Sequence, residues 1–191
     1  MAGELEQSLM RIIEDTPWFM RALHAVGTVG PPEACIGSGA IRNAVWDALH
    51  GYSEPSFLAD VDVPYFDPGD LSEASEKRYE RQLEELEPDL IWDVKNQAAV
   101  HLWFHKVFGH EVEPLRSMRD AASTWPETAL AVAVGRSADG AITITAPLGL
   151  DDLFSMVVRR NPRRVSIETY ERRIAEKKYT ARWPGVRILH E

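Results

Sequence analysis

Two aspartates stand at alternate positions in a segment whose pattern predicts a β-strand. Asp60 and Asp62 alternate with apolar residues between positions 58 and 65. In a strand, this spacing makes both carboxylates project from one face, a few ångströms apart. Such a pair repels unless a cation lies between its members. The pair alone also fits a solvent-facing polar stripe on a half-buried strand, so further residues are needed to decide.

A third aspartate favours the metal interpretation. Asp93 lies at the centre of a short apolar segment, residues 91–94, where an unpaired carboxylate would be unfavourable. If this segment is a strand beside the first, Asp93 completes an oxygen-rich site with Asp60 and Asp62. Oxygen ligands suit Mg²⁺ or Mn²⁺, which keep water ligands and bridge substrate phosphates. The predicted metal ligands and catalytic residues are therefore Asp60, Asp62 and Asp93, and the predicted chemistry involves phosphate.

A glycine turn precedes a predicted helix upstream of these acids. Gly37 and Gly39 would let the backbone approach a ligand closely, and the hydroxyl of Ser38 can donate a hydrogen bond. The N-terminus of the following helix favours an anion such as phosphate. Arg42, in the first helical turn, is placed to reach a phosphate oxygen. A simple tight turn and an ordinary surface arginine explain the same residues, so this signal is weak by itself.

Lys95 follows Asp93 by two residues and shares its strand face. Its ammonium group would neutralise a phosphate or pair with Asp93, and both interpretations stay open. Asn96 is predicted to cap the next helix. The predicted nucleotide-binding residues are Gly37, Ser38, Gly39, Arg42 and Lys95.

The periodicity of the apolar residues predicts the elements that must position this site. Thr16 and Pro17 are predicted to begin the second of two opening helices, and Pro64 is expected to interrupt strand pairing. Ala138, Asp139 and Gly140 are predicted to form the turn of a hairpin. Strands are predicted at 33–36, 58–65, 90–94, 127–134 and 142–145, and helices at 5–13, 17 onward, 41–49, 71–86, 96–108, 150–158 and 166–178.

This order of elements predicts an α+β protein in which helices flank a mixed β-sheet. We find no repeat and no linker, so residues 1–191 are expected to form one domain. It would contain two N-terminal helices, a catalytic sheet region at about 33–108, and a C-terminal hairpin with basic helices.

The ordered set CIGSGAIRN, ADVDV and IWDVK resembles the polymerase-beta-like nucleotidyltransferase pattern of a glycine-serine turn followed by a paired and then a single acidic strand. More closely, the chain is similar to a bacterial family of small, functionally uncharacterised nucleotidyltransferase-like proteins. That closer similarity lies in GAIRNAVWDALHGY, ADVDVPYFD, WDVKNQAAVHLW and APLGLDDLF. It implies the polymerase-beta-like fold over most of the chain.

The resemblance implies a task for each residue. Gly37 and Ser38 would cradle nucleotide phosphates, Asp60 and Asp62 would bind the catalytic metal, and Asp93 would complete the site beside the attacking hydroxyl. The implied reaction moves a nucleoside monophosphate from an NTP to an unknown acceptor and releases pyrophosphate. The acceptor would be a small molecule, a protein or RNA.

Two rival functions remain open. A binding module of the same fold would hold nucleotide or RNA without turnover. A metal-dependent phosphohydrolase would use similar ligands but transfer to water. NTP-dependent release of pyrophosphate discriminates the transferase from the binding module.

The charge of the chain is unevenly distributed. The formal net charge is −9, which argues against general polyanion binding. Residues 155–191, however, carry ten Lys and Arg against four Asp and Glu, and the rest carries 11 against 26. Within this basic segment, Arg159, Arg160, Arg163 and Arg164 fit either phosphate contacts or a solvated helix face.

Composition and apolar runs predict a cytoplasmic protein. No apolar run approaches the roughly 20 residues that span a bilayer, so no membrane partner is expected. The N-terminal segment lacks a signal-peptide pattern. The lone Cys35 is predicted to be a small buried side chain.

His101 and His105 have the spacing of a zinc protease motif but lack its glutamate, so we expect no zinc site. Asp151 and Asp152 are predicted to begin a helix. Core packing is the preferred explanation for most of the aromatic residues Trp92, Trp103, Phe104 and Phe108.

Overall fold

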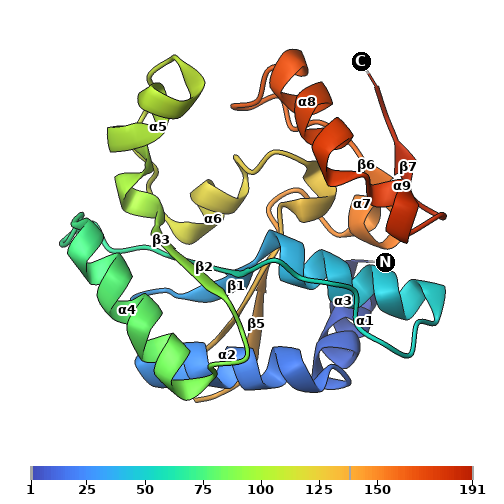
Figure 1. Ribbon diagram of the computed structural model, residues 1–191, viewed down its shortest axis with the longest axis horizontal. Coiled ribbons are helices and arrows are strands. Elements are labelled where there is room, and N and C mark those ends of the chain that lie inside the picture. The colour runs from blue at the N-terminus through green and yellow to red at the C-terminus, as the bar shows by residue number, and fades with distance from the viewer. Residues whose placement is uncertain (1, 138, 191) are drawn as a thin grey trace.

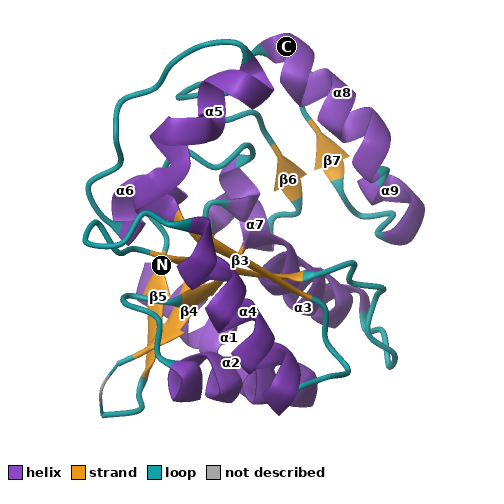
Figure 2. Ribbon diagram, turned by 60° about the vertical axis from the view of Figure 1, so that its left-hand side comes forward, coloured by secondary structure: helices purple, strands orange, loops and turns teal. Residues whose placement is uncertain are grey.

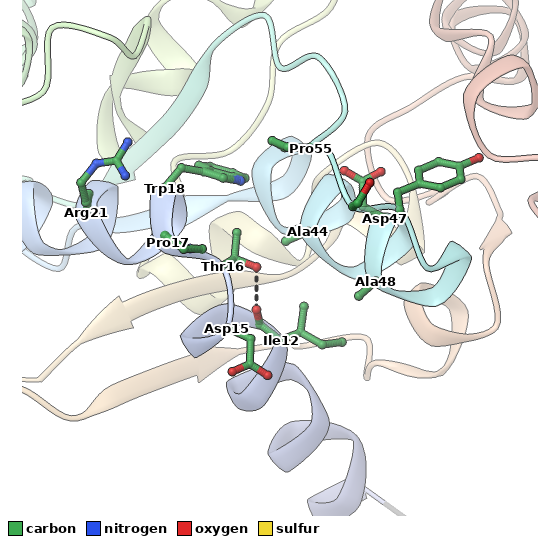
Figure 3. Close-up of a pocket in the computed structure, with 12 residues that line it drawn as sticks. Ile12, Asp15, Thr16, Pro17, Trp18, Arg21, Ala44, Asp47, Ala48 and Pro55 are labelled. Atoms are coloured by element: carbon green, nitrogen blue, oxygen red, sulfur yellow. Dashed lines mark hydrogen bonds between the residues drawn. The ribbon is translucent and has the colours of Figure 1, made fainter.

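Two amphipathic helices open the computed structural model, which describes residues 2–137 and 139–190. They are α1 (Ala2–Glu14) and α2 (Pro17–Val29), joined at Thr16. Pro17 occupies the first turn of α2 as predicted, but the side chain of Thr16 does not cap that helix. Its hydroxyl instead donates to the carbonyl of Ile12, 2.6 Å away (Figure 3), because the last turn of α1 offers it a free acceptor.

Five strands form the centre of the molecule as two sheets. Strand β2 (Val61–Tyr65) pairs in parallel with β3 (Trp92–Asn96). Strand β1 (Cys35–Gly37) pairs antiparallel with β4 (Ala133–Arg136), which pairs antiparallel with β5 (Ile142–Thr145). The predicted hairpin is thus confirmed, although Ala138 of its predicted turn lies outside the described residues.

Pro64 does not interrupt the pairing of β2 with β3, contrary to the prediction, because their register runs unbroken from Val61 to Tyr65. The amide of Val61 donates to Ile91 on the β3 side at 2.7 Å. Since alternate residues of a strand face opposite neighbours, the missing amide of Pro64 faces β1. There the carbonyl of Pro64 accepts a hydrogen bond from the thiol of Cys35 at 3.5 Å. The proline therefore explains why β1 lies beside β2 without forming a ladder.

The remaining elements connect and cover these strands. The helices are α3 (Ser38–His50), α4 (Glu73–Leu86), α5 (Val100–Phe108), α6 (Met118–Ala122), α7 (Asp151–Phe154), α8 (Ile167–Lys177) and α9 (Tyr179–Arg182). Two short 3₁₀ helices, η1 (Gln97–Ala99) and η2 (Thr128–Leu130), and the parallel pair β6 (Val157–Val158) and β7 (Arg187–Ile188) complete the set. Asn96 caps η1 as predicted, since its side chain accepts from the amide of Ala98 at 3.0 Å.

Two predicted boundaries are wrong. The helix expected over 150–158 ends at Phe154, because Met156 adopts a left-handed conformation with φ of 53° that breaks the helix. The strand expected from Glu127 begins only at Ala133, and residues 128–130 form η2 instead. The hydroxyl of Thr128 hydrogen-bonds to Asp152 at 2.5 Å, which ties η2 to α7.

The helices lie on two sides of the strands (Figures 1 and 2). Helices α1, α2 and α4 lie on one side, while α5, α6, α7 and α8 lie on the other. The core between them contains fully buried Trp46, Tyr65, Tyr170 and Tyr179. The α+β class predicted from the sequence is confirmed. Among the described residues, none of the helices combines the length and the apolar character that a membrane span needs.

Candidate functional site

The parallel ladder brings two of the three aspartates side by side. Asp62 on β2 is the register neighbour of Asp93 on β3. The alternation predicted that Asp60 lies within this strand, but Asp60 lies one residue before β2. Asp60 and Asp62 line one cavity, and Asp62 and Asp93 line the next. The structure therefore gathers the predicted acids around Asp62.

The carboxylate of Asp62 has no ion-pair partner among the described residues. Burial raises the pKa of Asp62 to about 6, with further increases from Asp60 and Asp93, although Lys177 and Arg173 partly offset them. Asp62 and Asp60 form no hydrogen bond or ion pair with the described part of the chain. An upward shift of this size means that the surroundings of Asp62 disfavour its charged form.

Lys95 pairs with Asp93, so one of its two predicted roles is realised in this structure. Its Nζ lies 3.1 Å from Oδ1 of Asp93 and 3.7 Å from Oε2 of Glu76. Burial lowers the pKa of Lys95, but Asp93 and Glu76 more than compensate, and the pKa is raised. Within residues 2–137 and 139–190, no three His, Cys, Asp or Glu side chains are grouped so that they could hold a metal ion. Asp93 would have to turn from Lys95 to join Asp60 and Asp62.

The glycine turn joins β1 to α3 beside these acids. Ser38 has a left-handed conformation with φ of 45°, an uncommon conformation for a residue other than glycine, and its amide donates to the carbonyl of Val132 at 3.1 Å. A Cβ added at Gly37 would lie 3.1 Å from the ring of Trp125 and 3.3 Å from Pro64, so a larger residue would be crowded there. A Cβ at Gly39 would lie 3.7 Å from Oδ2 of Asp62, an ordinary contact. Gly39 is therefore not required by packing, and its open side faces Asp62.

Three neighbouring cavities share walls in this region. The large cavity, of about 480 Å³, contains Ser38, Gly39, Arg42, Asp60 and Asp62 in its walls. The central cavity, of about 220 Å³, contains Gly37, Asp62, Asp93 and Lys95. The aromatic cavity, of about 350 Å³, lies between α5 and α8. Ser38, Asp62 and Arg173 line both the large and the central cavity, and Lys95, Gln97, Trp125, Pro126 and Arg173 line both the central and the aromatic cavity.

Arg42 lies in the wall of the large cavity but is held by other side chains. Its guanidinium carbon lies 5.1 Å from the ring centroid of Tyr179 and 5.2 Å from that of Trp183. One guanidinium nitrogen donates to Oδ1 of Asn43 at 2.6 Å. Burial lowers the pKa of Arg42, with opposing contributions from Tyr179 and Glu127. The role predicted for Arg42, a phosphate contact, stays a prediction.

The cations nearest the acids come from α8 and α9. Arg173, Lys177 and Arg182 line the large cavity. The pattern of α8 contains a signal for the first two: Tyr170 and Ile174 are buried, and Arg173 and Lys177 are four residues apart on one helical face. Sequence reasoning had instead singled out the arginines at 159–164.

Those four arginines hold the C-terminal part together. Arg159 pairs with Asp152 at 3.1 Å, and Arg163 pairs with Asp120 at 2.6 Å. The other two donate to backbone carbonyls: Arg160 to Val165 at 2.7 Å and Arg164 to Glu113 at 2.6 Å. None of the four lines the large or the central cavity. The phosphate interpretation of this cluster is therefore wrong for the site formed by the aspartates.

A buried ion pair anchors Arg173. Its Nε donates to Oε1 of Glu127 at 2.6 Å, and Glu127 is fully buried. Burial lowers the pKa of Arg173, but the attraction of Glu127, Tyr179 and Asp62 more than offsets this, so the pKa is raised. Arg173 is therefore a fixed positive charge that lines all three cavities.

Other predicted features have structural roles. Burial raises the pKa of Cys35 to about 12, so its thiol stays protonated and is no nucleophile. Trp92 and Phe104 are buried, as core packing predicted. Trp103 and Phe108, however, are 37% and 40% exposed and line the aromatic cavity, so core packing is wrong for them. His101 and His105 form no grouped metal site in the described part of the chain.

A further cavity of about 440 Å³ lies on another face of α3, between α1, α2 and the loop after α3 (Figure 3). None of the predicted site residues lines it. Asp47 lies in its wall and accepts from the amide of Ser56 at 2.6 Å and from Nε1 of Trp183 at 2.8 Å. These bonds fix the loop that carries residues 56–60 into the large cavity.

Comparison with solved structures identifies the class of protein that has this fold. One solved structure, described as revealing a CCA-adding enzyme head domain by NMR, matches with a TM-score of 0.81 and 26% identity. The match covers 97% of this chain and 96% of that chain. It supports the polymerase-beta-like nucleotidyltransferase fold that the resemblance implied.

A family model described as nucleotidyltransferase matches residues 24–188, and the chain belongs to this nucleotidyltransferase family. The enzyme class predicted from the sequence is thereby confirmed. No curated protein matches the chain.

Proposed function

We propose that the protein transfers a nucleoside monophosphate from an NTP to an acceptor, with a divalent metal ion at Asp60 and Asp62. The observation that carries this proposal is the position of Asp62. It lies beside the glycine turn, where burial and then the charges of Asp60 and Asp93 raise its pKa to about 6, in a groove lined by Arg173 and Lys177. Carboxylates favour the metal, and the cations favour the phosphates of the nucleotide.

The residues fit Mg²⁺ or Mn²⁺. Asp60 and Asp62 have no protein cation paired with them in the described residues, and a bound divalent ion would offset the burial and the repulsion that raise the pKa of Asp62. Asp93 would join them after release from Lys95, whose ammonium group would then be available to a phosphate. When bound, the metal supplies charge neutralisation at the phosphates and activation of the attacking oxygen.

The reaction has one bond made and one broken. An acceptor oxygen attacks the α-phosphorus, and the bond from that phosphorus to the oxygen that bridges it to the β-phosphate breaks. The bridging oxygen keeps the electron pair and leaves as part of pyrophosphate. The acceptor's proton passes to water or to Asp93. In this arrangement the triphosphate lies against Ser38, Gly39 and Arg173, and Lys177 and Arg182 contact its outer oxygens.

Calorimetry and pyrophosphate detection test the proposed metal dependence and the proposed contact of the nucleotide with Gly39. Wild type is expected to bind NTP only with Mg²⁺ and to release pyrophosphate when cell extract supplies the acceptor. Gly39→Ala should fold normally, because the added Cβ makes only ordinary contacts and alanine is favoured over glycine in a helix by about 1 kcal/mol. The methyl group would occupy the space before Asp62 and should weaken NTP binding at least about tenfold.

Gly3→Ala is the matched control, since Gly3 lies in α1 and a Cβ there meets nothing within 4 Å. It should leave NTP binding unchanged. Equal NTP affinity for Gly39→Ala and wild type would remove the glycine turn from the site. Failure of wild type to bind any NTP would support the alternative of a ligand other than a nucleotide.

In this proposal, the side chain of Phe57 would cover the nucleobase. It is 90% exposed, lines the large cavity, and sits on a loop whose carbonyl accepts from Nδ2 of Asn43 at 3.1 Å. An exposed aromatic ring on an anchored loop gives a stacking surface for any base. Stacking contributes about 1–3 kcal/mol per base.

Phe57→Ala is therefore expected to raise KM for all four NTPs by roughly 5- to 100-fold with an unchanged melting temperature. The measurement is steady-state pyrophosphate release with each NTP. Leu148→Ala removes another exposed apolar side chain outside the large cavity and should leave KM unaltered. A KM for Phe57→Ala equal to that of wild type would place the base elsewhere.

A further inference from the structure

The aromatic cavity has a composition that matches a particular kind of ligand. It adjoins the central cavity, which Asp93 lines, and the central cavity in turn adjoins the large cavity. Its floor contains aromatic rings from α5 together with Trp125 and Pro126. Its opposite wall is α8, which with α5 rises on the same side of the strands (Figure 1).

Two exposed rings in this cavity offer flat apolar surface. Trp103 and Phe108 are 37% and 40% exposed, and Phe104 lies between them with its centroid 4.4 Å from that of Phe108. Arg164 covers another part of Phe104, with its guanidinium carbon 5.6 Å from the ring centroid. Exposed rings that pack on one another and face a cavity form a surface on which a planar ligand can stack.

The same cavity contains a cation without a partner. Lys95 pairs with Asp93, and Arg173 pairs with Glu127. Arg164 donates to the carbonyl of Glu113. Arg172 is exposed and forms no hydrogen bond or ion pair with the described part of the chain. Glu176 is the acid in the lining. The cavity thus combines a flat apolar surface with an available guanidinium group. This combination favours a ligand that has both an aromatic ring and an anionic group.

We propose that the aromatic cavity binds the acceptor, and that this acceptor is a small planar aromatic molecule with an anionic group. This inference rests on the proposed function, because the acceptor hydroxyl would enter the central cavity beside Asp93 and attack the α-phosphorus there. The ring stacks on Trp103 and Phe108, and Arg172 binds the anionic group.

The size and charge of the surroundings favour a small acceptor over a nucleic acid. A cavity of about 350 Å³ holds a ligand of roughly nucleotide size. The chain has a net charge of −9, and Glu76 of α4 lies 3.7 Å from Lys95 at the edge of this cavity, so acidic groups stand close to a longer polyanion. Long nucleic acids bind through many cationic contacts, and three of the four cations that line this cavity are already engaged with protein groups.

Calorimetric titration with phenyl phosphate tests the inference. Cyclohexyl phosphate, which lacks the aromatic ring, and phenol, which lacks the anion, are the comparison ligands. Phenyl phosphate should bind more tightly than either. Trp103→Ala and Arg172→Gln should each weaken its binding at least about tenfold.

The matched controls lie on the same helix as Trp103. Leu102→Ala and Lys106→Gln change exposed side chains of α5 that do not line the aromatic cavity, and both should bind phenyl phosphate as wild type does. Binding of phenyl phosphate that is absent, or that neither Trp103→Ala nor Arg172→Gln weakens, would overturn the inference. So would a short single-stranded RNA that binds more tightly than phenyl phosphate and depends on Arg172.

A titration of Asp62→Asn separates this inference from the proposed function. The variant should lose Mg-NTP binding but keep phenyl phosphate binding, because Asp62 does not line the aromatic cavity. If wild type binds and turns over Mg-NTP but not phenyl phosphate, the acceptor inference alone is wrong. If wild type binds phenyl phosphate but no NTP, the proposed function is wrong, and the assignment of this cavity to an acceptor falls with it.

Discussion

Asp62→Asn is expected to lower pyrophosphate release by about 10³-fold while making the metal-free protein more stable at pH 7. The loss of rate follows from removal of a predicted ligand, since metal stabilisation of phosphoryl charge contributes several kcal/mol. The gain in stability follows from the pKa of Asp62, which burial, Asp60 and Asp93 raise to about 6. A neutral asparagine removes that unfavourable ionisation.

The sign of the pH dependence follows from the direction of the pKa shift. The pKa of an unfolded aspartate is about 3.9, so the folded protein holds the proton of Asp62 more tightly than the unfolded chain. This contribution to stability is complete below about pH 4 and is lost as the pH rises towards 6. The stability difference between Asp62→Asn and wild type should therefore grow from pH 4 to pH 6 and reach about 2–3 kcal/mol above it.

Thermal and urea unfolding with and without Mg²⁺ check this expectation. Mg²⁺ and the proton compete for Asp62, so added Mg²⁺ should stabilise wild type above pH 6 and have little effect on Asp62→Asn. Asp89→Asn changes an exposed aspartate between α4 and β3 and should alter neither stability nor rate. An Asp62→Asn variant that turns over Mg-NTP at the rate of wild type would refute the metal assignment.

The sequence predicted the acids and the turn because their signals are local. Alternation around Asp62, the apolar surroundings of Asp93 and the glycines at 37 and 39 each depend on a few neighbouring residues. The structure then brings Asp62 beside Asp93 through a parallel register that follows from strand pairing over 30 residues of chain. The ion pair of Asp93 with Lys95 adds a partner that the alternation alone does not decide.

Charge density in the sequence did not identify the cations beside the acids, because their roles depend on long-range packing. Arg163 and Arg173 are ten residues apart in one basic segment, yet Arg163 pairs with Asp120 and Arg173 lines the cavities beside Asp62. Charge density in the sequence is the same for both. Only the burial of Tyr170 and Ile174 decides which face of α8 turns towards the acids.

Trp103 and Phe108 illustrate the same limit for apolar residues. Helical spacing predicts that aromatic residues share a face, but it does not state whether that face is covered. In this protein α8 and α5 both line the aromatic cavity, and Trp103 and Phe108 each keep more than a third of their residue surface exposed. The sequence therefore predicted the helix and missed the surface it forms.

Glu127→Gln is expected to be the most destabilising of the proposed substitutions, by about 3 kcal/mol. Glu127 is fully buried, and its Oε1 accepts from Nε of Arg173 at 2.6 Å. Its Oε2 is buried without a hydrogen-bond partner among the described residues, so the carboxylate depends on the nearby positive charges of Arg173 and Arg42. Loss of one member of a buried ion pair leaves the other charge uncompensated, at about 3–5 kcal/mol.

Urea unfolding of Glu127→Gln, Arg173→Gln and the double variant measures this coupling. The double variant should be less destabilised than the sum of the single variants, because neither buried charge then remains alone. Glu87→Gln is the matched control: its partner Arg21 lies 3.2 Å away, but the pair is 51% and 21% exposed and should contribute less than about 1 kcal/mol. Additive effects of the two single substitutions would show that Glu127 does not hold Arg173. Another interaction would then have to hold the guanidinium group of Arg173 beside Asp62 and the three cavities.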